Sequence, residues 1–215
     1  MKSIKTVLNT YLFKTGLDAG VNQQQAVNLW PIVVGKKIAE KTTKDFAYKW
    51  IYDPRGFREN TWMPHFFKQV NSQDLESVKR TDQEIHAIVS YLFDRSESFK
   101  MEKMQNKGNA DNGRMLVNSL GCLGCHATEG EEQVALKSVN SVRREHGPNL
   151  INLGSKTTQK WIYNWIRDPQ SYHSGTKMPN LRLSKEEASD ISAYLIGQRD
   201  KDFEKNPRPE VDENG

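Results

Sequence analysis

Apolar side chains recur along this chain at the spacing of an α-helix, and no stretch alternates between apolar and polar residues as a strand would. Two stripes are clearest, one through Ile85, Ile88, Tyr91 and Leu92 and one through Ala188, Ile191, Tyr194 and Leu195. Spacings of three and four residues place such side chains on one face of a helix, where they pack against a core. The pattern therefore predicts an all-α fold.

Each stripe is preceded by a sequence that typically starts a helix. The two sequences are Thr81-Asp82-Gln83-Glu84 and Ser184-Lys185-Glu186-Glu187. A hydroxyl at the N-cap and a Glu three residues later form a capping box, in which each side chain bonds to the backbone N–H of the other residue. We therefore predict one helix that begins after Thr81 and another that begins after Ser184.

Two segments of the chain are copies of each other, which indicates an internal repeat. Residues 41–64 and 156–179 align without a gap at an offset of 115, and 11 of the 24 positions are identical. Each copy has a pair of threonines at its start, two aromatic residues four positions apart, and an Asp-Pro step. The pattern predicts a short helix that threonine caps and that ends before Pro54 or Pro169.

The repeat divides the chain into two tandem helical domains. The offset between the two predicted capping boxes is only 103, so the first copy has 12 extra residues, which we place around 69–79. We predict a first domain over residues 1–98, a polar linker over 99–108 and a second domain over 109–202. Residues 203–215 are polar and acidic and contain proline, which predicts a disordered tail.

The chemistry of the chain lies in Cys122-Leu123-Gly124-Cys125-His126, which holds its two cysteines. Two thiols separated by two residues of a helical turn match the two vinyl groups on one edge of a porphyrin, to which they add. The imidazole of the next residue then lies under the ring and binds the iron. The motif predicts one covalent haem c, attached at Cys122 and Cys125, with His126 as the proximal ligand.

Three other uses of these cysteines fit the sequence less well. A zinc site needs four ligands, and the chain has no further cysteine and no pair of histidines at zinc-finger spacing. A thioredoxin-like dithiol expects a βαβ setting, which a helical pattern does not provide. A structural disulfide in so short a loop is unusual. Haem attachment is the interpretation that also uses His126.

Around this motif, residues 109–200 resemble the small mono-haem c-type cytochromes that have a methionine ligand. Gly113-Arg114-Met115-Leu116-Val117 resembles the N-terminal helix of that family, in which a glycine lets the C-terminal helix cross closely. The resemblance implies that Tyr194 or Leu195 lies at this crossing. The charged loop over 129–145 has no obvious counterpart in the family.

One loop of the resemblance concerns the proximal side of the haem. His146-Gly147-Pro148-Asn149-Leu150 resembles the loop whose proline carbonyl accepts a hydrogen bond from the proximal imidazole. The resemblance implies that Pro148 has this role here and fixes the orientation of His126 without contacting the iron.

A second loop concerns the distal side. Thr176-Lys177-Met178-Pro179-Asn180-Leu181 is similar to the loop that presents the distal methionine, which makes Met178 the expected sixth ligand. A thioether is a soft ligand that favours ferrous iron and raises the reduction potential. The alternatives are His146 or His173 as the ligand, an open sixth position, and a Met178 that only fills the core.

The first copy keeps a Met-Pro step, Met63-Pro64, but residues 1–98 contain no cysteine. Its histidines, His65 and His86, follow the place where a proximal ligand belongs, and an attachment site would fall near residues 16–21. We therefore predict a cytochrome-like domain without haem. A non-covalent haem held by Met63 and His86 is the alternative.

Charge and hydropathy narrow the class of partner. The net charge is +4, with 15 Lys and Arg against 11 Asp and Glu in residues 1–100 and 16 of each in the remainder. The signs alternate without a basic run, which disfavours nucleic acid and leaves an acidic protein partner open. The longest apolar run is far shorter than the roughly 20 residues of a membrane-spanning helix, so no transmembrane segment is predicted.

The expected location follows from the haem. Covalent attachment takes place in oxidising compartments outside the cytoplasm, so we expect a bacterial periplasm or its equivalent. Residues 1–18 lack the continuous apolar stretch of a secretory signal, so no signal peptide is seen.

The predicted function is electron transfer and not enzymatic catalysis. The protein would act as a carrier, or as an electron-relay subunit that meets redox protein partners in a larger respiratory oxidoreductase complex, with the haem-less domain as a docking module. Two alternatives need an open or exchangeable sixth position on the iron. One is a haem enzyme, either a peroxidase or a small-molecule reductase, and the other is a haem-based sensor.

Overall fold

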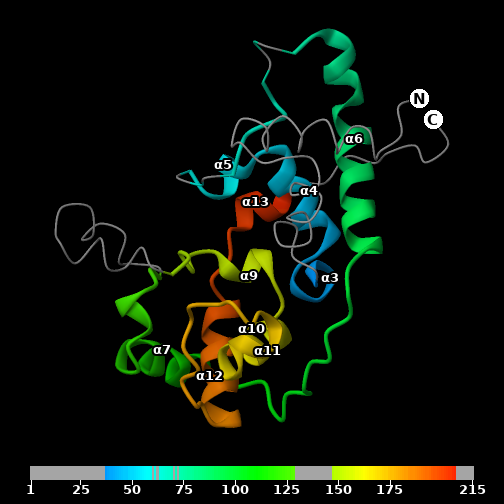
Figure 1. The fold of residues 1–215 in the computed structure, drawn as a ribbon. Coiled ribbons are helices and arrows are strands. Elements are labelled where there is room, and N and C mark those ends of the chain that lie inside the picture. Colours follow the sequence, from blue (N-terminus) through cyan, green and yellow to red (C-terminus); the bar gives the residue numbers. More distant parts are fainter. Residues whose placement is uncertain are drawn as a thin grey trace. The chain divides into compact units, whose positions relative to one another are not determined.

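The computed structural model describes residues 37–59, 61, 63–69, 71, 73–128 and 147–206. Every regular element within these ranges is a helix (Figure 1), which confirms the predicted all-α fold. None of these helices is long and apolar enough to cross a bilayer. Residues 16–21, the loop over 129–145 and His146 lie outside the described residues.

The chain divides into two compact units. Described residues 37–98 belong to the first unit, and residues 99–206 form the second. The first unit contains α3 (Ile38–Lys41), α4 (Lys44–Tyr52), α5 (Pro54–Phe57) and α6 (Leu75–Asp94). Its core lies between α4 and α6 and is formed by Ala47, Tyr48, Phe67, Ile85 and Val89.

The start of α6 differs from the prediction of a capping box at Thr81, which is wrong. Asp74 is the N-cap, and its carboxylate accepts a hydrogen bond from the backbone N–H of Ser77 at 2.6 Å. Thr81 is buried inside the helix, where its hydroxyl donates to the Ser77 carbonyl at 3.0 Å. The helix extends about two turns further because Asp74 is itself a good cap and no glycine or proline follows it before Thr81.

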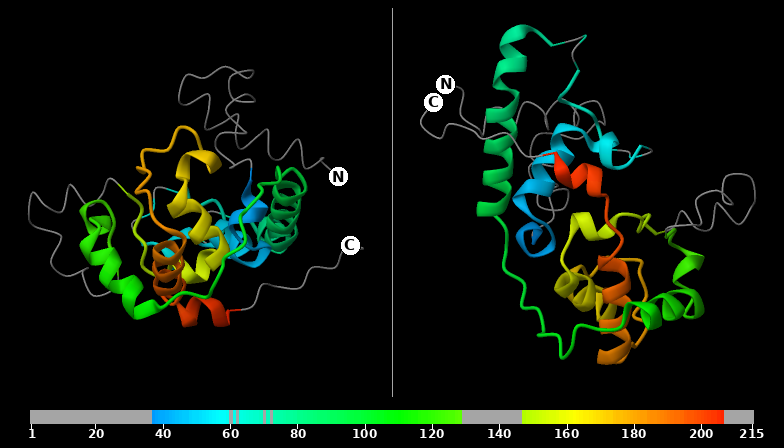
Figure 2. Two further views of the ribbon diagram at one scale, coloured as in Figure 1. Left: turned by 90° about the horizontal axis from the view of Figure 1, so that it is seen from below. Right: turned by 180° about the vertical axis from the view of Figure 1, so that it is seen from behind.

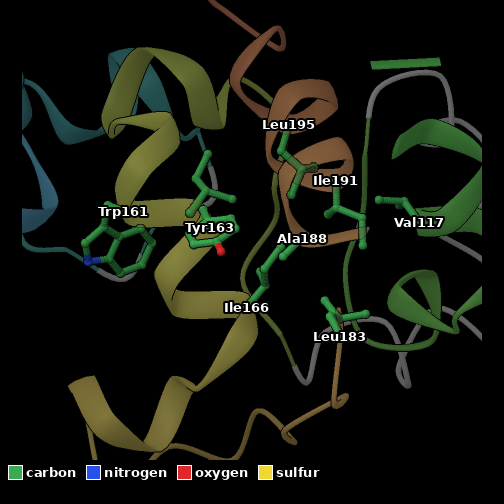
Figure 3. Close-up of a cluster of buried hydrophobic side chains, with 9 residues drawn as sticks. Val117, Trp161, Tyr163, Ile166, Leu183, Ala188, Ile191 and Leu195 are labelled. Atoms are coloured by element: carbon green, nitrogen blue, oxygen red, sulfur yellow. The ribbon is translucent and has the colours of Figure 1, made fainter. Parts of the chain in front are cut away.

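The second unit contains seven elements within the described residues, in chain order α7 (Ala110–Ser119), the 3₁₀ turn η1 (Cys122–Gly124), α9 (Leu153–Lys156), α10 (Gln159–Arg167), α11 (Pro169–Tyr172), α12 (Lys185–Ile196) and α13 (Lys201–Lys205). Helix α12 packs against both α7 and α10 (Figure 2). Figure 3 shows Ala188, Ile191 and Leu195 of α12 between Val117 of α7 and Ile166 of α10. The core therefore joins the helix that precedes the cysteine motif to a helix of the repeat.

Gly113 sets the crossing of α7 over α12. A Cβ at this position would lie 2.0 Å from the Asp190 carbonyl oxygen, so only glycine lets the two backbones approach this closely. The Asp190 carboxylate accepts hydrogen bonds from the Asn109 backbone N–H at 2.7 Å and from the Asn112 side chain at 2.6 Å. The expected contact with Tyr194 or Leu195 is therefore wrong by about one turn, because these polar bonds fix the register at Asp190.

Helix α12 begins at the predicted capping box. The backbone N–H of Glu187 donates to the Ser184 hydroxyl at 3.1 Å, and the backbone N–H of Ser184 donates to the Glu187 carboxylate at 2.9 Å. These bonds from Ser184 hold the pKa of the Glu187 carboxyl below its ordinary value. The prediction for this helix is confirmed.

The two copies of the repeat have the same local structure. Thr43 caps α4 and Thr158 caps α10, each by accepting a bond from the backbone N–H three residues later. In each copy two aromatic rings stack and a third stands edge-on against both, namely Phe46, Trp50 and Phe57 in the first unit and Trp161, Trp165 and Tyr172 in the second. The stacked pair has its ring planes 16° apart in the first unit and 15° apart in the second. The repeat in the sequence is therefore also a repeat in the structure.

Two predicted segments differ from the structure. Residues 99–108, predicted as a linker, belong to the second unit, where Met101 and Met104 pack against its core. Residues 203–205, predicted as the start of a disordered tail, lie in α13, whose N-cap is Asp200. Both segments are polar in composition, and their order comes from hydrogen bonds that composition does not reveal.

Candidate haem site

Helix α7 leads to the cysteine motif through a left-handed turn. Gly121 has a φ of +82°, which glycine adopts without strain, and it separates the end of α7 from η1. The backbone N–H groups of Cys125 and His126 both donate to the Cys122 carbonyl, at 3.2 and 3.0 Å. The two thiols and the imidazole are thus presented by one tight turn.

The two cysteines differ in their surroundings. Cys122 is half-buried and packs against the core of the second unit, whereas Cys125 is exposed, and the two form no disulfide. Burial raises the pKa of the Cys122 thiol above its ordinary value. Within the described residues, no three or more His, Cys, Asp or Glu side chains gather as potential metal ligands.

The orientation of His126 is fixed from the opposite loop. Its Nδ1 lies 2.7 Å from the Pro148 carbonyl oxygen, and since that oxygen only accepts, Nδ1 carries the proton. The other ring nitrogen, Nε2, then has the lone pair that a metal needs. Two backbone bonds of 2.9 Å, from Gly147 to Cys125 and from Leu150 to Ala127, hold this loop against the motif.

Gly147 makes room for the imidazole. A Cβ at this position would lie 2.5 Å from His126 Cε1 and 2.6 Å from His126 Nδ1. Such distances are too short for any side chain, so the loop can approach His126 only as glycine. The sequence of the Pro148 loop alone does not reveal the role of Gly147, because the need for glycine depends on a contact 21 positions away.

Met178 is held by a hydrogen bond to its sulfur. The indole Nε1–H of Trp165 donates to Met178 Sδ at 2.9 Å, and the backbone N–H of Met178 donates to the Thr176 hydroxyl at 3.2 Å. The half-buried side chain packs against the core of the second unit. The sulfur keeps a further lone pair for a metal.

Sequence reasoning missed the bond from Trp165, although the repeat contained the signal. Trp165 precedes Met178 by 13 residues, and Trp50 precedes Met63 by the same 13. The backbone N–H of Met63 donates to the Thr61 hydroxyl at 3.1 Å, as its counterpart does in the second unit. A spacing kept in both copies indicates that the indole and the methionine loop are positioned together.

The histidine alternatives for the sixth ligand have little described structure. His173 is exposed and contributes its carbonyl to a turn that receives the Thr176 N–H at 3.1 Å. His146 lies outside the described residues. The assignment of Met178 stays a prediction.

The residues present fit a haem c by their chemistry. The motif supplies two free thiols and an imidazole whose Nδ1 is already engaged, and the gap at Gly147 preserves that imidazole's position. A thioether with a fixed orientation is available on a separate loop. Thiols, one imidazole and one thioether are the donors by which proteins bind a c-type haem.

Comparison with known proteins agrees with this chemistry. Residues 110–197 match the family model for cytochrome c. The chain is also 30% identical over 95 residues to a cytochrome c oxidase subunit 2 of Alkalihalophilus pseudofirmus, an alignment that covers 40% of this chain and 25% of that protein. The chain thus spans about a quarter of the length of the curated relative that it matches. No solved structure matches the chain.

The match settles the chemical class of the second unit. Domains of this family hold a covalent haem c, usually act as electron carriers and not as enzymes, and typically work outside the cytoplasm. The Cys122 and Cys125 pair lies inside the matched region. Residues 110–197 are a cytochrome c domain, which implies electron transfer through one c-type haem.

Proposed function

We propose that this protein passes single electrons, as a carrier or as an electron-relay subunit of a larger respiratory oxidoreductase complex. Cys122 and Cys125 would hold the haem as thioethers, with His126 and Met178 on the iron. The observation that supports this most directly is the 2.7 Å contact between His126 Nδ1 and the Pro148 carbonyl. When bound, the haem supplies a centre that gains and loses one electron.

The role of Pro148 in this proposal is to fix the proximal imidazole. Its carbonyl accepts the Nδ1 proton, which selects one tautomer and one ring orientation. A hydrogen bond at Nδ1 also makes Nε2 a stronger electron donor. An electron carrier benefits from such rigidity, because its ligands should move little between the two oxidation states.

The role of Met178 is to occupy the distal side with a soft donor. A thioether favours ferrous iron, and the bond from Trp165 withdraws electron density from the sulfur, which favours the ferrous state further. With histidine and methionine both bound, substrate has no position on the iron. This arrangement supports a carrier over a peroxidase, a reductase or a sensor.

For the first unit we propose a cytochrome-like domain that binds a partner and holds no haem. It shares the capped helix and the cluster of three aromatic rings with the second unit, yet residues 1–98 contain no cysteine. Residues 1–100 have four more basic than acidic side chains, 15 against 11, which favours docking onto an acidic surface of the partner. The likeness of the chain to an oxidase subunit is consistent with a partner from a respiratory complex.

The proposed ligands are tested in the holoprotein by exchange of the two methionines. Met178→Ala should retain the covalent haem, lose the methionine-to-ferric charge-transfer band, lower the reduction potential and allow carbon monoxide to bind the ferrous form. Met63→Ala is the matched control, because Met63 occupies the same loop position in the other copy, and it should change none of these. Rapid carbon monoxide binding or peroxidase turnover by the unmodified protein would instead favour the enzyme or the sensor.

A further inference from the structure

Residues 99–108, here called the strap, lie outside the part of the chain that matches cytochrome c. The match begins at Ala110, whereas the second unit begins at Phe99. The strap forms no helix, yet it is hydrogen-bonded to α10 at several points and pairs with Lys185 of α12 through Glu102. Its contacts with the rest of the unit are therefore a feature of this chain and are not explained by the matched domain.

Glu102 is the most closely held residue of the strap. Its backbone N–H donates to Asn164 Oδ1 at 2.8 Å, and its carbonyl accepts from Asn164 Nδ2 at 3.2 Å. Its carboxylate pairs with Arg167 and lies 3.9 Å from Lys185 Nζ. Asn164 and Arg167 both belong to α10, so the strap and this helix are held together by backbone and charge.

A line of aromatic contacts runs from the strap to the sulfur of Met178. The ring of Phe99 stands edge-on to Tyr172, with centroids 5.2 Å apart and planes at 84°. Tyr172 in turn stands edge-on to Trp165 at 5.8 Å. Trp165 donates its indole N–H to Met178 Sδ at 2.9 Å. Three consecutive contacts therefore link Phe99 of the strap to the Met178 sulfur.

The C-terminal end of the strap is anchored to the same two helices. The Lys107 carbonyl accepts from the Gln159 side chain at 2.7 Å, which ties it to the first turn of α10. Gly108 has a φ of +75°, and a Cβ there would lie 2.1 Å from the Ser189 carbonyl oxygen of α12. The strap is thus fixed at both ends and at its centre.

The first copy of the repeat lacks the residues that bind the strap in the second copy. At the offset of 115, Asn164 and Arg167 correspond to Lys49 and Tyr52, whereas Trp165 corresponds to Trp50. Lys49 pairs with Asp45 of its own helix at 2.9 Å. The residues that grip the strap therefore occur in the copy that has the haem motif and are absent from the other.

We infer that the strap positions the distal ligand, with Glu102 and Phe99 as positioning residues that hold α10 so that the Trp165 N–H stays on the Met178 sulfur. The inference rests on Met178 as the sixth ligand, as proposed above. Loss of the strap contacts frees α10 to move, which weakens the hydrogen bond and loosens the methionine. Because a thioether prefers ferrous iron, a loosened methionine lowers the reduction potential and exposes ferric iron to added ligands.

The test uses the full-length holoprotein with Glu102→Gln, Asn164→Ala and Phe99→Ala. Imidazole is titrated against the ferric form, since it binds only where the sixth ligand has left. Asn164→Ala should raise the apparent imidazole affinity about tenfold, which is the effect of losing the single hydrogen bond from Trp165 to the Met178 sulfur. The reduction potential should fall as well, by about 59 mV for each tenfold by which the ferrous form loses more methionine affinity than the ferric form. Glu102→Gln should give a smaller change with the same sign, and its exposed side chain makes misfolding no obstacle.

Three controls make the outcomes distinct. Lys103→Ala changes an exposed side chain of the strap and should leave potential and affinity unchanged. In a Trp165→Phe background, Asn164→Ala should add nothing further, because both act through the same bond. Strap variants that lower the melting temperature but leave the potential and the imidazole affinity at wild-type values would overturn the inference. If Met178→Ala itself leaves imidazole binding unchanged, the proposed ligand fails first and the inference fails with it.

Discussion

Two glycines beside His126 and the cysteines differ in whether the structure has room for a side chain at their position. A Cβ at Gly147 would lie 2.5 Å from the imidazole, whereas a Cβ at Gly124, between the cysteines, would meet nothing within 4 Å. Both are glycines of the same site, and neither has a positive φ. Gly147 and Gly124 are therefore suitable for paired substitutions, because a side chain would collide with the His126 imidazole at Gly147 only.

We predict that Gly147→Ala disturbs the proximal side and that Gly124→Ala does not. The added methyl group at Gly147 must displace either the ring or the loop, which breaks the bond from His126 to Pro148 and costs about 1–3 kcal/mol of stability. The ferric spectrum should show a high-spin fraction, and the yield of holoprotein should fall. Equal spectra for the two variants would show that the loop adjusts freely and that Pro148 does not orient the ring.

Sequence reasoning at this scale identified the residues with reactive atoms better than the residues that make room for them. Cys122, Cys125 and His126 were identifiable because all three belong to one motif of five consecutive residues. The role of Gly147 depends on its distance to a residue 21 positions away, which local spacing does not give. The only sequence signal for Trp165 is the spacing of 13 residues to the methionine in both copies, and the contact itself is visible only when the loop and the helix are placed.

Helix starts show the same division between local rules and packing. The capping box at Ser184 was predictable, and the bonds to Glu187 are present. The similar sequence at Thr81 lies inside α6, because Asp74 offered an earlier cap and no glycine or proline stops the helix between the two. A cap sequence therefore marks a permitted start, and the surrounding chain decides whether the helix uses it.

The Ser184 cap makes stability depend on pH. Folding lowers the pKa of Glu187 below 4.5, so its stabilisation is fully present above the unfolded value and is lost as the pH falls through the lower folded value. The carboxylate is close to the solvent, so the effect should be only a few tenths of a kcal/mol, on the order expected for exposed groups. Glu187→Gln should make the urea concentration at half-unfolding depend less on pH below about pH 5, where a carboxyl of ordinary Glu pKa begins to protonate.

Glu186→Gln is the matched control for this prediction, because Glu186 is exposed in the same turn and forms no part of the capping box. It should leave the slope of stability against pH as in the parent chain. A Glu187→Gln protein with the parent's full acid sensitivity would mean that other carboxylates govern this range.

The crossing of α7 and α12 is the second element-scale prediction. Gly113→Ala would place a methyl group 2.0 Å from the Asp190 carbonyl, so the helices must separate. Overpacking costs about 3 kcal/mol, and the better helix propensity of alanine returns only about 1 kcal/mol. We expect a net loss of about 2 kcal/mol in denaturant unfolding. Arg114→Ala, on the exposed side of the same helix, should stay within about 0.5 kcal/mol, and equal losses in both variants would contradict a close crossing.

At the scale of the whole molecule, the boundary between the units matters for how the chain is divided. The residues before the matched cytochrome c domain include both the first unit and the strap. Polar composition predicted residues 99–108 as a linker, but Glu102 exchanges backbone bonds with Asn164 and so belongs to the second unit. Composition cannot distinguish a free polar segment from one whose backbone is held.

Two truncations should therefore behave differently. Removal of residues 1–98 should leave the spectrum and potential of the haem domain nearly unchanged while it abolishes association with the native partner. Removal of residues 1–108 deletes the strap as well and should lower the potential and the melting temperature. The measurements are spectroelectrochemical titration and pull-down from native extract. Full partner affinity without residues 1–98 would rule out the docking role, and identical potentials for both truncations would rule out a role for the strap.

The cluster of three aromatic rings has a consequence for assembly order. In the first unit, Phe46, Trp50 and Phe57 adopt the same arrangement as their counterparts, although that unit has no cysteine to attach a cofactor. The proposal that the first unit holds no haem requires that this arrangement forms from protein alone. During biogenesis, α10 and α11 would then fold before haem is attached, and haem attachment would complete the folding of the second unit. Pulse-labelled apoprotein should accordingly protect the backbone amides of α10 from hydrogen exchange before those of α7.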